Sequence, residues 1–393
     1  MTTVPLHLAV ALDGAGWHPA AWRDPAVDPR ELFTARRWAG LVTEAERGLL
    51  DFVTIEDALS LQSTLPDGPD ERAGQVRGRL DAVLLAARLA PLTKRIGLVP
   101  TATTTHTEPF HVAIGIATLD HVSAGRAGWR VQVSPRRTEA AHFGRREVPP
   151  LDPRRLDTDL LADLFGEAAD AVEVARRLWD SWEDDAEIRD VPTGRFVDRD
   201  KLHYIDFTGA RFSVRGPSIT PRPPQGRPIV TVLDHGHSRV PYELPARSAD
   251  IVHVTPHSRA EAEAITGRIR ALPREGEPLK IFADLVVFLG EDAAARKAGL
   301  DELDGAEFTS DAAVFTGTAE ELADLLLDWR EAGIEGYRLR PGAVPHDLEA
   351  ITRRLVPALR RRGAFRREYE AATLRGLLGL PRPDSRYREA ATV

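Results

Sequence analysis

The sequence contains no cysteine among its 393 residues and only one methionine. The missing thiols exclude disulfide bonds, thiolate nucleophiles, zinc–thiolate centres and iron–sulfur clusters. Any reactive group must therefore come from other side chains or from a bound cofactor.

Long hydrophobic runs are also missing. The most apolar segment, IFADLVVFLG (281–290), is interrupted by Asp284 and is too short to cross a membrane. The first residues, MTTVPLHLAVALDG, lack the basic start of a signal peptide. The net charge of −8 disfavours an electrostatic nucleic-acid surface. We therefore expect a cytoplasmic protein with no membrane or nucleic-acid partner.

Short β-branched runs alternate with amphipathic helical patterns along most of the chain. Most of these runs are apolar throughout, as expected for parallel strands covered on both faces. They are residues 6–12, 51–57, 95–104, 128–134, 228–233, 249–255, 280–290 and 336–341. No Gly-x-Gly-x-x-Gly follows the first run, which counts against a Rossmann domain. The pattern predicts a closed (β/α)8 TIM barrel.

Two helices carry clear start signals. Asp28, with proline next and glutamate at the third position, predicts a helix that runs to Gly48. Thr318 predicts the start of another, whose leucines repeat at helical spacing up to Gly333.

We expect one domain over residues 1–393, with two departures from the barrel rhythm. Residues 183–227 are rich in proline and glycine and predict a long insertion before the fifth strand. Residues 348–393 predict a helical, arginine-rich C-terminal extension.

In such barrels the active site lies at the C-terminal ends of the strands. This rule selects residues 56–57, 101–106, 130–134, 234–238 and His253. Each has an ordinary alternative: Glu56 and Asp57 could cap a helix, and His106 could be a surface residue. The stretch GRAGWRVQVS (125–134) admits close approach by a backbone or a flat ligand, yet Arg130 places a charge there.

The segment GHSRVP (236–241) follows the fifth strand. Its backbone N–H groups with His237, Ser238 and Arg239 would suit a phosphate at a loop–helix junction. His235, His237 and His253 could instead bind a metal for a hydrolase, which is a weak signal.

Several long motifs, in one order, resemble a known family. They are GWHPAAWR (16–23), ERGLLDFVTIEDA (46–58), IGLVPTATTTHTEPFHVAIGIATLDHVSAGRAGWRVQVS (96–134), EAAHFG (139–144), RRLWDSWEDDA (176–186), FSVRGPSITPRPPQGRPIV (212–230) and LVPALRRRGAFRREYEAATLRGLLGLPRP (355–383). The chain resembles the bacterial-luciferase-like flavin-dependent monooxygenases, in the group of nitrilotriacetate monooxygenase, dibenzothiophene-sulfone monooxygenase and the pristinamycin synthase large subunit.

The resemblance implies a two-component enzyme with a (β/α)8 barrel that binds reduced FMN from a separate NAD(P)H:flavin reductase. Oxygen would add at flavin C4a, and the resulting hydroperoxide would oxygenate a small-molecule substrate. Water must be kept from such a site, and the insertion 183–227 is expected to cover the barrel mouth. A homodimer is also implied.

Residue by residue, the resemblance assigns Asp57, Thr101 and Thr103 to flavin contacts and Ser238 to the flavin phosphate. His237 and Arg239 flank Ser238 in the same phosphate segment. Trp17 and Trp22 of the first loop would line the substrate side. His18 and His106 are placed to transfer protons, because imidazole titrates near neutrality.

The chain also departs from the family. Arg130 replaces a flavin-facing asparagine, and Leu161 and Phe165 stand where the family has a His-x-x-x-Tyr pair. Arg130 could stabilise the negative charge of reduced flavin, or pair with Glu56 or Asp57 and fill the site. The departures leave two alternatives open: a deazaflavin-dependent oxidoreductase of the same fold, and a non-catalytic paralogue that serves as a partner subunit.

Overall fold

A computed structural model describes residues 5–63, 65, 67–150, 157–234 and 247–388. Eight parallel strands close into a barrel, because β1 pairs with both β2 and β13 and β10 pairs with both β9 and β11. In ring order they are β1 (His7–Leu12), β2 (Phe52–Ile55), β3 (Gly97–Thr103), β4 (Gly128–Gln132), β9 (Ile229–Asp234), β10 (Ile251–Val254), β11 (Lys280–Leu289) and β13 (Gly336–Pro341). All eight strands predicted from the apolar runs are confirmed.

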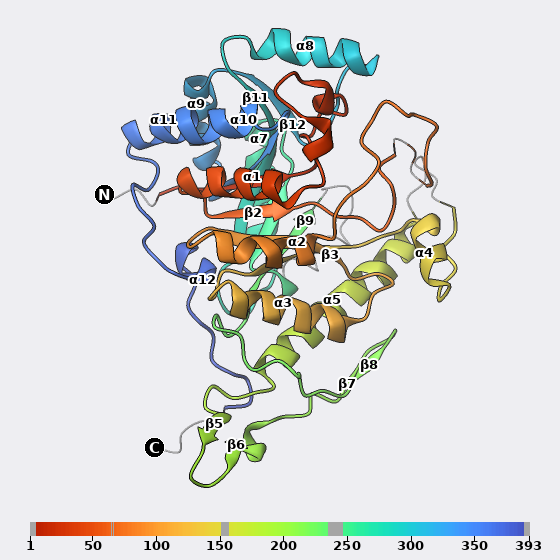
Figure 1. The fold of residues 1–393 in the computed structure, drawn as a ribbon, viewed down its shortest axis with the longest axis vertical. Coiled ribbons are helices and arrows are strands. Elements are labelled where there is room, and N and C mark those ends of the chain that lie inside the picture. Colours follow the sequence, from red (N-terminus) through yellow and green to blue (C-terminus); the bar gives the residue numbers. More distant parts are fainter. Residues whose placement is uncertain (1–4, 64, 66, 151–156, 235–246, 389–393) are drawn as a thin grey trace.

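A ninth strand, β12 (Ala313–Gly317), was not predicted. It pairs with the last residues of β11, outside the ring. Helices surround the barrel (Figure 1). They are α1 (Ala35–Arg47), α2 (Ala82–Leu89), α3 (Pro109–Val122), α4 (Arg137–Phe143), α5 (Thr158–Asp180), α7 (Arg259–Arg270), α8 (Ala293–Asp304), α9 (Ala319–Arg330), α10 (His346–Ala350), α11 (Val356–Arg361) and α12 (Leu374–Leu377). Among the helices of the described residues, none has the length and apolar character needed to cross a bilayer.

The two helix-start signals had different outcomes. Thr318 caps α9 in a complete capping box with Glu321, as predicted. The helix predicted to start after Asp28 was placed wrongly: Asp28 caps a single 3-10 turn (Pro29–Glu31), and α1 begins only after Thr34. Two capping signals within seven residues therefore start two separate helical segments.

The C-terminal extension closes the N-terminal end of the barrel. Leu374, Leu378 and Leu380 pack against inward-facing residues of six strands. A Cβ on Gly97 would lie 2.7 Å from Leu374 Cδ1 and 2.8 Å from Phe52 Cβ, so the close packing here requires a glycine. Arg366 adds an ion pair with the fully buried Asp51.

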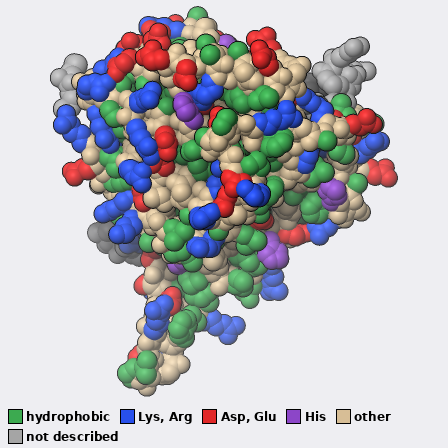
Figure 2. Space-filling model, turned by 45° about the horizontal axis from the view of Figure 1, so that its top comes forward, with side chains coloured by type: hydrophobic (Ala, Val, Ile, Leu, Met, Phe, Trp, Pro, Cys, Tyr) green, Lys and Arg blue, Asp and Glu red, His purple; other side chains and the backbone are tan. Residues whose placement is uncertain are grey.

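The expectation that the insertion covers the barrel mouth was wrong, because none of its residues lines the main cavity at the C-terminal ends of the strands. Residues 183–227 form the hairpins β5–β6 (Glu187–Asp190, Arg195–Val197) and β7–β8 (Phe207–Thr208, Ser213–Val214). At the base of the first hairpin, Arg222 contacts the C-terminal segment through Pro383 O, at 2.7 Å. The hairpin projects as a narrow arm (Figures 1 and 2), with Val191 87% exposed near its tip.

Neighbouring strands occupy the space beside Gly128, the first residue of β4. A Cβ on Gly128 would lie 2.9 Å from Val99 Cγ2 and 3.1 Å from Ile229 O of the adjacent strands. The glycine therefore permits close strand packing rather than ligand contact.

Candidate functional site

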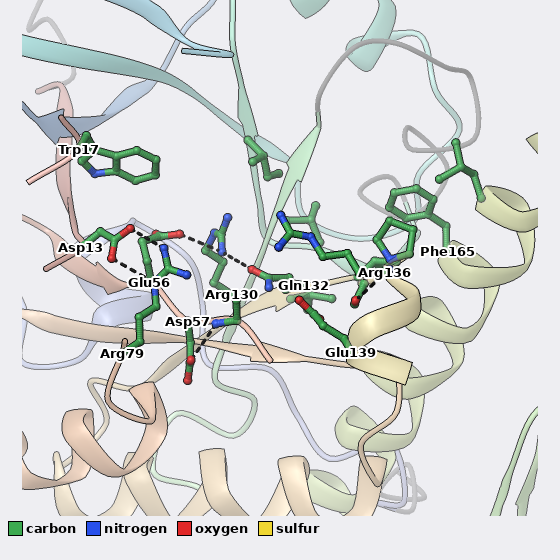
Figure 3. Close-up of a pocket in the computed structure, with 18 residues that line it drawn as sticks. Asp13, Trp17, Glu56, Asp57, Arg79, Arg130, Gln132, Arg136, Glu139 and Phe165 are labelled. Carbon is green, nitrogen blue, oxygen red and sulfur yellow. Dashed lines mark hydrogen bonds and ion pairs between the residues drawn. The ribbon is translucent and has the colours of Figure 1, made fainter. Parts of the chain in front are cut away.

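A cavity of about 490 Å³ opens at the C-terminal ends of the barrel strands. Figure 3 shows Trp17 at one end of it and Phe165 at the other, with Arg130 between them. Its lining comes from the loop after β1, the ends of β2, β4 and β9, the segments before α2 and after β4, and helices α4 and α5: Asp13, Trp17, Glu56, Asp57, Ala58, Arg79, Arg130, Val131, Gln132, Val133, Ser134, Pro135, Arg136, Glu139, Leu161, Phe165, Val232 and Leu233. Glu56, Asp57 and residues 130–134, which the strand-end rule selected, all line this cavity.

Arg130 forms the polar floor of this cavity. Its Nη1 lies 3.2 Å from Glu56 Oε2 and donates to Thr101 Oγ1 at 3.0 Å and Gln132 Oε1 at 3.2 Å. Its Nε is buried and has no hydrogen-bond partner. Burial lowers the pKa of Arg130, and the charge of Glu56 opposes that shift. The pairing with Glu56, one of the two alternatives raised by the sequence, is therefore present, yet Arg130 still lines the cavity.

A second layer of buried charge lies beneath the floor. Arg338 Nη1 donates to Glu56 Oε1 at 3.2 Å, and Arg338 Nε donates to Asp284 Oδ1 at 2.9 Å. Arg340 Nε donates to Asp284 Oδ2 at 2.9 Å, and Arg340 Nη1 reaches the partly exposed Asp311. Three arginines thus share two deeply buried carboxylates, and the partly exposed Asp311 supplies a third negative charge at the outer end of the network.

The charges of this network control its titration. Burial alone would raise the pKa of Glu56, but Arg130 and Arg338 outweigh burial and hold the pKa below its usual range. Burial likewise opposes ionisation of Asp284, and Arg338 and Arg340 hold its pKa well below the usual range. Both carboxylates therefore stay ionised at neutral pH.

Asp57 lines the cavity and also anchors the backbone. Its Oδ1 accepts from Ala58 N at 2.7 Å and its Oδ2 accepts from Ala82 N at 2.9 Å, at the start of α2. Burial raises the pKa of Asp57. Asp57 thus combines the capping role with a position facing the cavity.

The predicted threonines lie on the same strand face as Arg130. Thr101 pairs in register with Arg130, and Thr103 pairs with Gln132. Both threonines are buried. Neither is part of the cavity lining, so Thr101 supports Arg130 from below.

The first loop forms a neighbouring cavity of about 200 Å³ that also contains Asp13 and Trp17. Trp17 therefore borders both spaces, and the Arg340 guanidinium lies 4.5 Å from the centre of its ring. Trp22 and His18 line the smaller cavity. The two tryptophans thus line the smaller cavity together, Trp17 also lines the main one, and their place on the substrate side stays a prediction.

The two predicted histidines lie apart. His18 Nε2 lies 3.0 Å from Asp301 Oδ1, and His18 Nδ1 accepts from Ala20 N, so both ring nitrogens are engaged. His106 lines a separate cavity of about 220 Å³, stacked on Phe143, and its Nε2 is buried without a partner. Burial lowers the pKa of both imidazoles. Neither lines the Arg130 cavity, and their proton-transfer role stays a prediction.

Four predicted residues lie outside the described residues. These are His235, His237, Ser238 and Arg239, so their assignment to a phosphate or a metal stays a prediction. His253 is described: it is fully buried, its Nδ1 lies 3.4 Å from Asp284 Oδ1, and burial lowers its pKa to about 4. No group of three or more potential metal ligands occurs within the part of the chain that the structure describes.

Leu161 and Phe165 both line the cavity from α5, which makes this wall apolar. Sequence reasoning missed Arg79, which holds Asp13 through two hydrogen bonds of 3.1 and 2.7 Å, and it missed Arg338 and Arg340. A signal for the last two existed: arginines two apart on a predicted barrel strand must share one face.

Comparison with known proteins agrees with this geometry. The model of the luciferase-like monooxygenase family matches residues 15–337. Nitrilotriacetate monooxygenase component A of Aminobacter aminovorans is 31% identical, over 96% of this chain and 97% of that protein. N-acetyl-S-(2-succino)cysteine monooxygenase of Bacillus subtilis (strain 168) is 30% identical, over 97% and 98%. A solved riboflavin lyase with modified FMN and riboflavin is 25% identical, with a TM-score of 0.82 and 96% of both chains covered.

Proposed function

The chain belongs to the luciferase-like monooxygenase family, and from this membership we propose how this flavin-dependent monooxygenase works. It takes reduced FMN from a separate NAD(P)H:flavin reductase and transfers one oxygen atom of O2 to a small organic substrate. The observation that carries the proposal is the cavity at the strand ends, whose floor is the buried Arg130.

The residues of this cavity fit a flavin. A volume of about 490 Å³ is within the usual range for small-molecule and cofactor sites. Apolar side chains such as Val131, Leu161 and Phe165 offer contacts for a flat aromatic ring. Arg130 Nε is a buried donor without a partner, which a ligand acceptor would satisfy.

Reduced FMN, when bound, supplies the electrons that activate O2. Arg130 faces the ligand with a positive charge and stabilises the negative charge of reduced flavin. Glu56 and Thr101 hold the Arg130 guanidinium in place. Asp57 has lone pairs left on both carboxylate oxygens and accepts from flavin N–H groups.

The substrate side of the site is the first loop. Trp17 stands between the large cavity and the smaller one, so a substrate in the smaller space lies against the flavin across this ring. Trp17 and Trp22 exclude water from that side, which protects the reaction with O2. His18 and His106 are proposed for proton transfer, and Ser238, His237 and Arg239 for the flavin phosphate.

A stopped-flow experiment tests the proposal. The protein is loaded anaerobically with reduced FMN and mixed with O2, while free reduced FMN serves as the control. Protein-bound flavin should reoxidise with kinetics distinct from the free flavin. Identical kinetics at saturating protein would contradict a monooxygenase site. The proposed homodimer is tested separately by light scattering of the purified protein.

A further inference from the structure

The end of the cavity away from Trp17 carries charges that the floor network does not use. Arg136 and Glu139 lie there, close to Phe165 (Figure 3). Arg136 follows β4 and precedes α4, and Glu139 lies in the first turn of α4.

Arg136 differs from the other two arginines of the cavity. Arg79 is paired with Asp13, and Arg130 is paired with Glu56. Within the described part of the chain, Arg136 forms no ion pair, and its Nη1 donates to the neutral Ser60 Oγ at 3.0 Å. A half-buried guanidinium in this state can still bind an anion.

Glu139 provides an unused acceptor beside it. The residue is only 2% exposed, and its Oε1 accepts from Ser60 Oγ at 2.7 Å. Its Oε2 is buried without a hydrogen-bond partner. Such an acceptor needs a donor from a ligand or from water. Ser60 therefore links a free cation and a free acceptor on one side of the cavity.

The facing wall of α5 offers no polar alternative. Leu161 and Phe165 are its contributions to the cavity, and neither side chain can donate or accept a hydrogen bond. Among the described residues at this end of the cavity, Arg136 and Glu139 are the charged side chains available to a ligand with an anionic group and a neighbouring hydroxyl.

We propose that Arg136 and Glu139, linked by Ser60, bind the ribityl phosphate tail of FMN, in addition to the phosphate contacts proposed above for Ser238, His237 and Arg239. Arg136 donates to the phosphate, and Glu139 Oε2 accepts from a ribityl hydroxyl. This inference rests on the proposed function, because it requires the cavity to hold FMN.

The test compares two flavins that differ only in the phosphate. Reduced FMN and reduced riboflavin are titrated anaerobically into the wild type and into Arg136→Gln, Arg136→Lys and Arg137→Gln. Arg137 is the matched control, since it is the next arginine in the chain, is 61% exposed at its side chain and pairs with Asp67. The ratio of the two dissociation constants cancels any change that affects both flavins alike.

We expect the wild type to bind reduced FMN more tightly than reduced riboflavin. Loss of a charge-assisted hydrogen bond in Arg136→Gln should reduce this preference by about 10- to 100-fold. Arg136→Lys should keep part of the preference, and Arg137→Gln should keep all of it.

If Arg136→Gln keeps the full preference for reduced FMN over reduced riboflavin, the phosphate assignment is wrong. The same result is expected if Arg136 instead binds a carboxylate of the substrate. Failure of the wild type to bind either flavin would instead overturn the proposed function and this subsite together. The two failures are therefore distinguishable.

Discussion

Replacement of Glu56 by glutamine should destabilise the protein strongly. Glu56 is 8% exposed and holds Arg130 and Arg338, each at 3.2 Å, and it accepts from Thr54 Oγ1 at 3.1 Å. The glutamine keeps the shape of the side chain but leaves two buried arginines with less compensation. Removal of one partner of a buried ion pair costs about 3–5 kcal/mol.

The cost converts into a melting-temperature change. An unfolding entropy of about 2.1 cal/mol/K per residue over 393 residues makes each kcal/mol worth slightly more than 1 °C. Glu56→Gln should therefore lower the melting temperature by about 4–6 °C in a calorimetric scan at pH 7.5.

The chain offers a matched control in Glu320. This carboxylate also pairs with two arginines, Arg361 and Arg362, but its side chain is 52% exposed. Exposed pairs contribute about 0–1 kcal/mol, so Glu320→Gln should shift melting by no more than about 1 °C. Equal shifts for Glu56→Gln and Glu320→Gln would refute the claim that the floor network depends on burial.

A double variant tests the ion pair between Glu56 and Arg130. When Arg130→Gln is added to Glu56→Gln, one of the two uncompensated cations is removed. The double variant should therefore be more stable than the sum of the two single losses, by about 0.5–3 kcal/mol. Additive losses would show that Glu56 and Arg130 do not interact.

Three further predictions concern other buried groups. His253 has a pKa of about 4 in the folded protein, below its ordinary 6.5. Its neutral imidazole therefore contributes fully to the free energy of unfolding above pH 6.5. This contribution, about 3 kcal/mol, is lost as the pH falls towards 4. His253→Asn should flatten the decline of melting temperature over that interval, and an unchanged slope would count against it. Arg366→Gln should cost about 3–5 kcal/mol, because it leaves Asp51 with less compensation, and should make the C-terminal extension easier to cleave by protease; wild-type resistance would disprove the anchor. At least one of His18→Ala and His106→Ala should slow NAD(P)H-coupled oxygen turnover about 100-fold, and wild-type rates in both would end the proton-transfer hypothesis.

The barrel could be predicted because its strands are buried on both faces. Apolar runs such as residues 249–255 and 280–290 are legible without any tertiary information. β12 was missed because it lies outside the ring and its five residues are only half-buried. The insertion was misplaced because sequence position cannot tell which end of the barrel a long connection packs against.

The site could be predicted only as far as strand ends identify it. Asp57 and Arg130 were selected because they lie in or just after buried apolar runs, near the C-terminal ends of β2 and β4. The charge balance of Arg130 depends on Glu56 and on Arg338, whose strand lies 282 residues after Glu56 in the chain. Such a partner can be proposed from the alternation of side chains along a strand, but its contact depends on barrel register.

The central claim is that Arg130 belongs to a working flavin site. The most direct measurement is an anaerobic titration of the wild type and of Arg130→Gln with reduced and with oxidised FMN, followed by tryptophan fluorescence. The account predicts saturable, micromolar binding of reduced FMN by the wild type, tighter than that of oxidised FMN, and a preference reduced about tenfold or more in Arg130→Gln. Absence of saturable binding to the folded wild type, or an equal preference in both proteins, would contradict it.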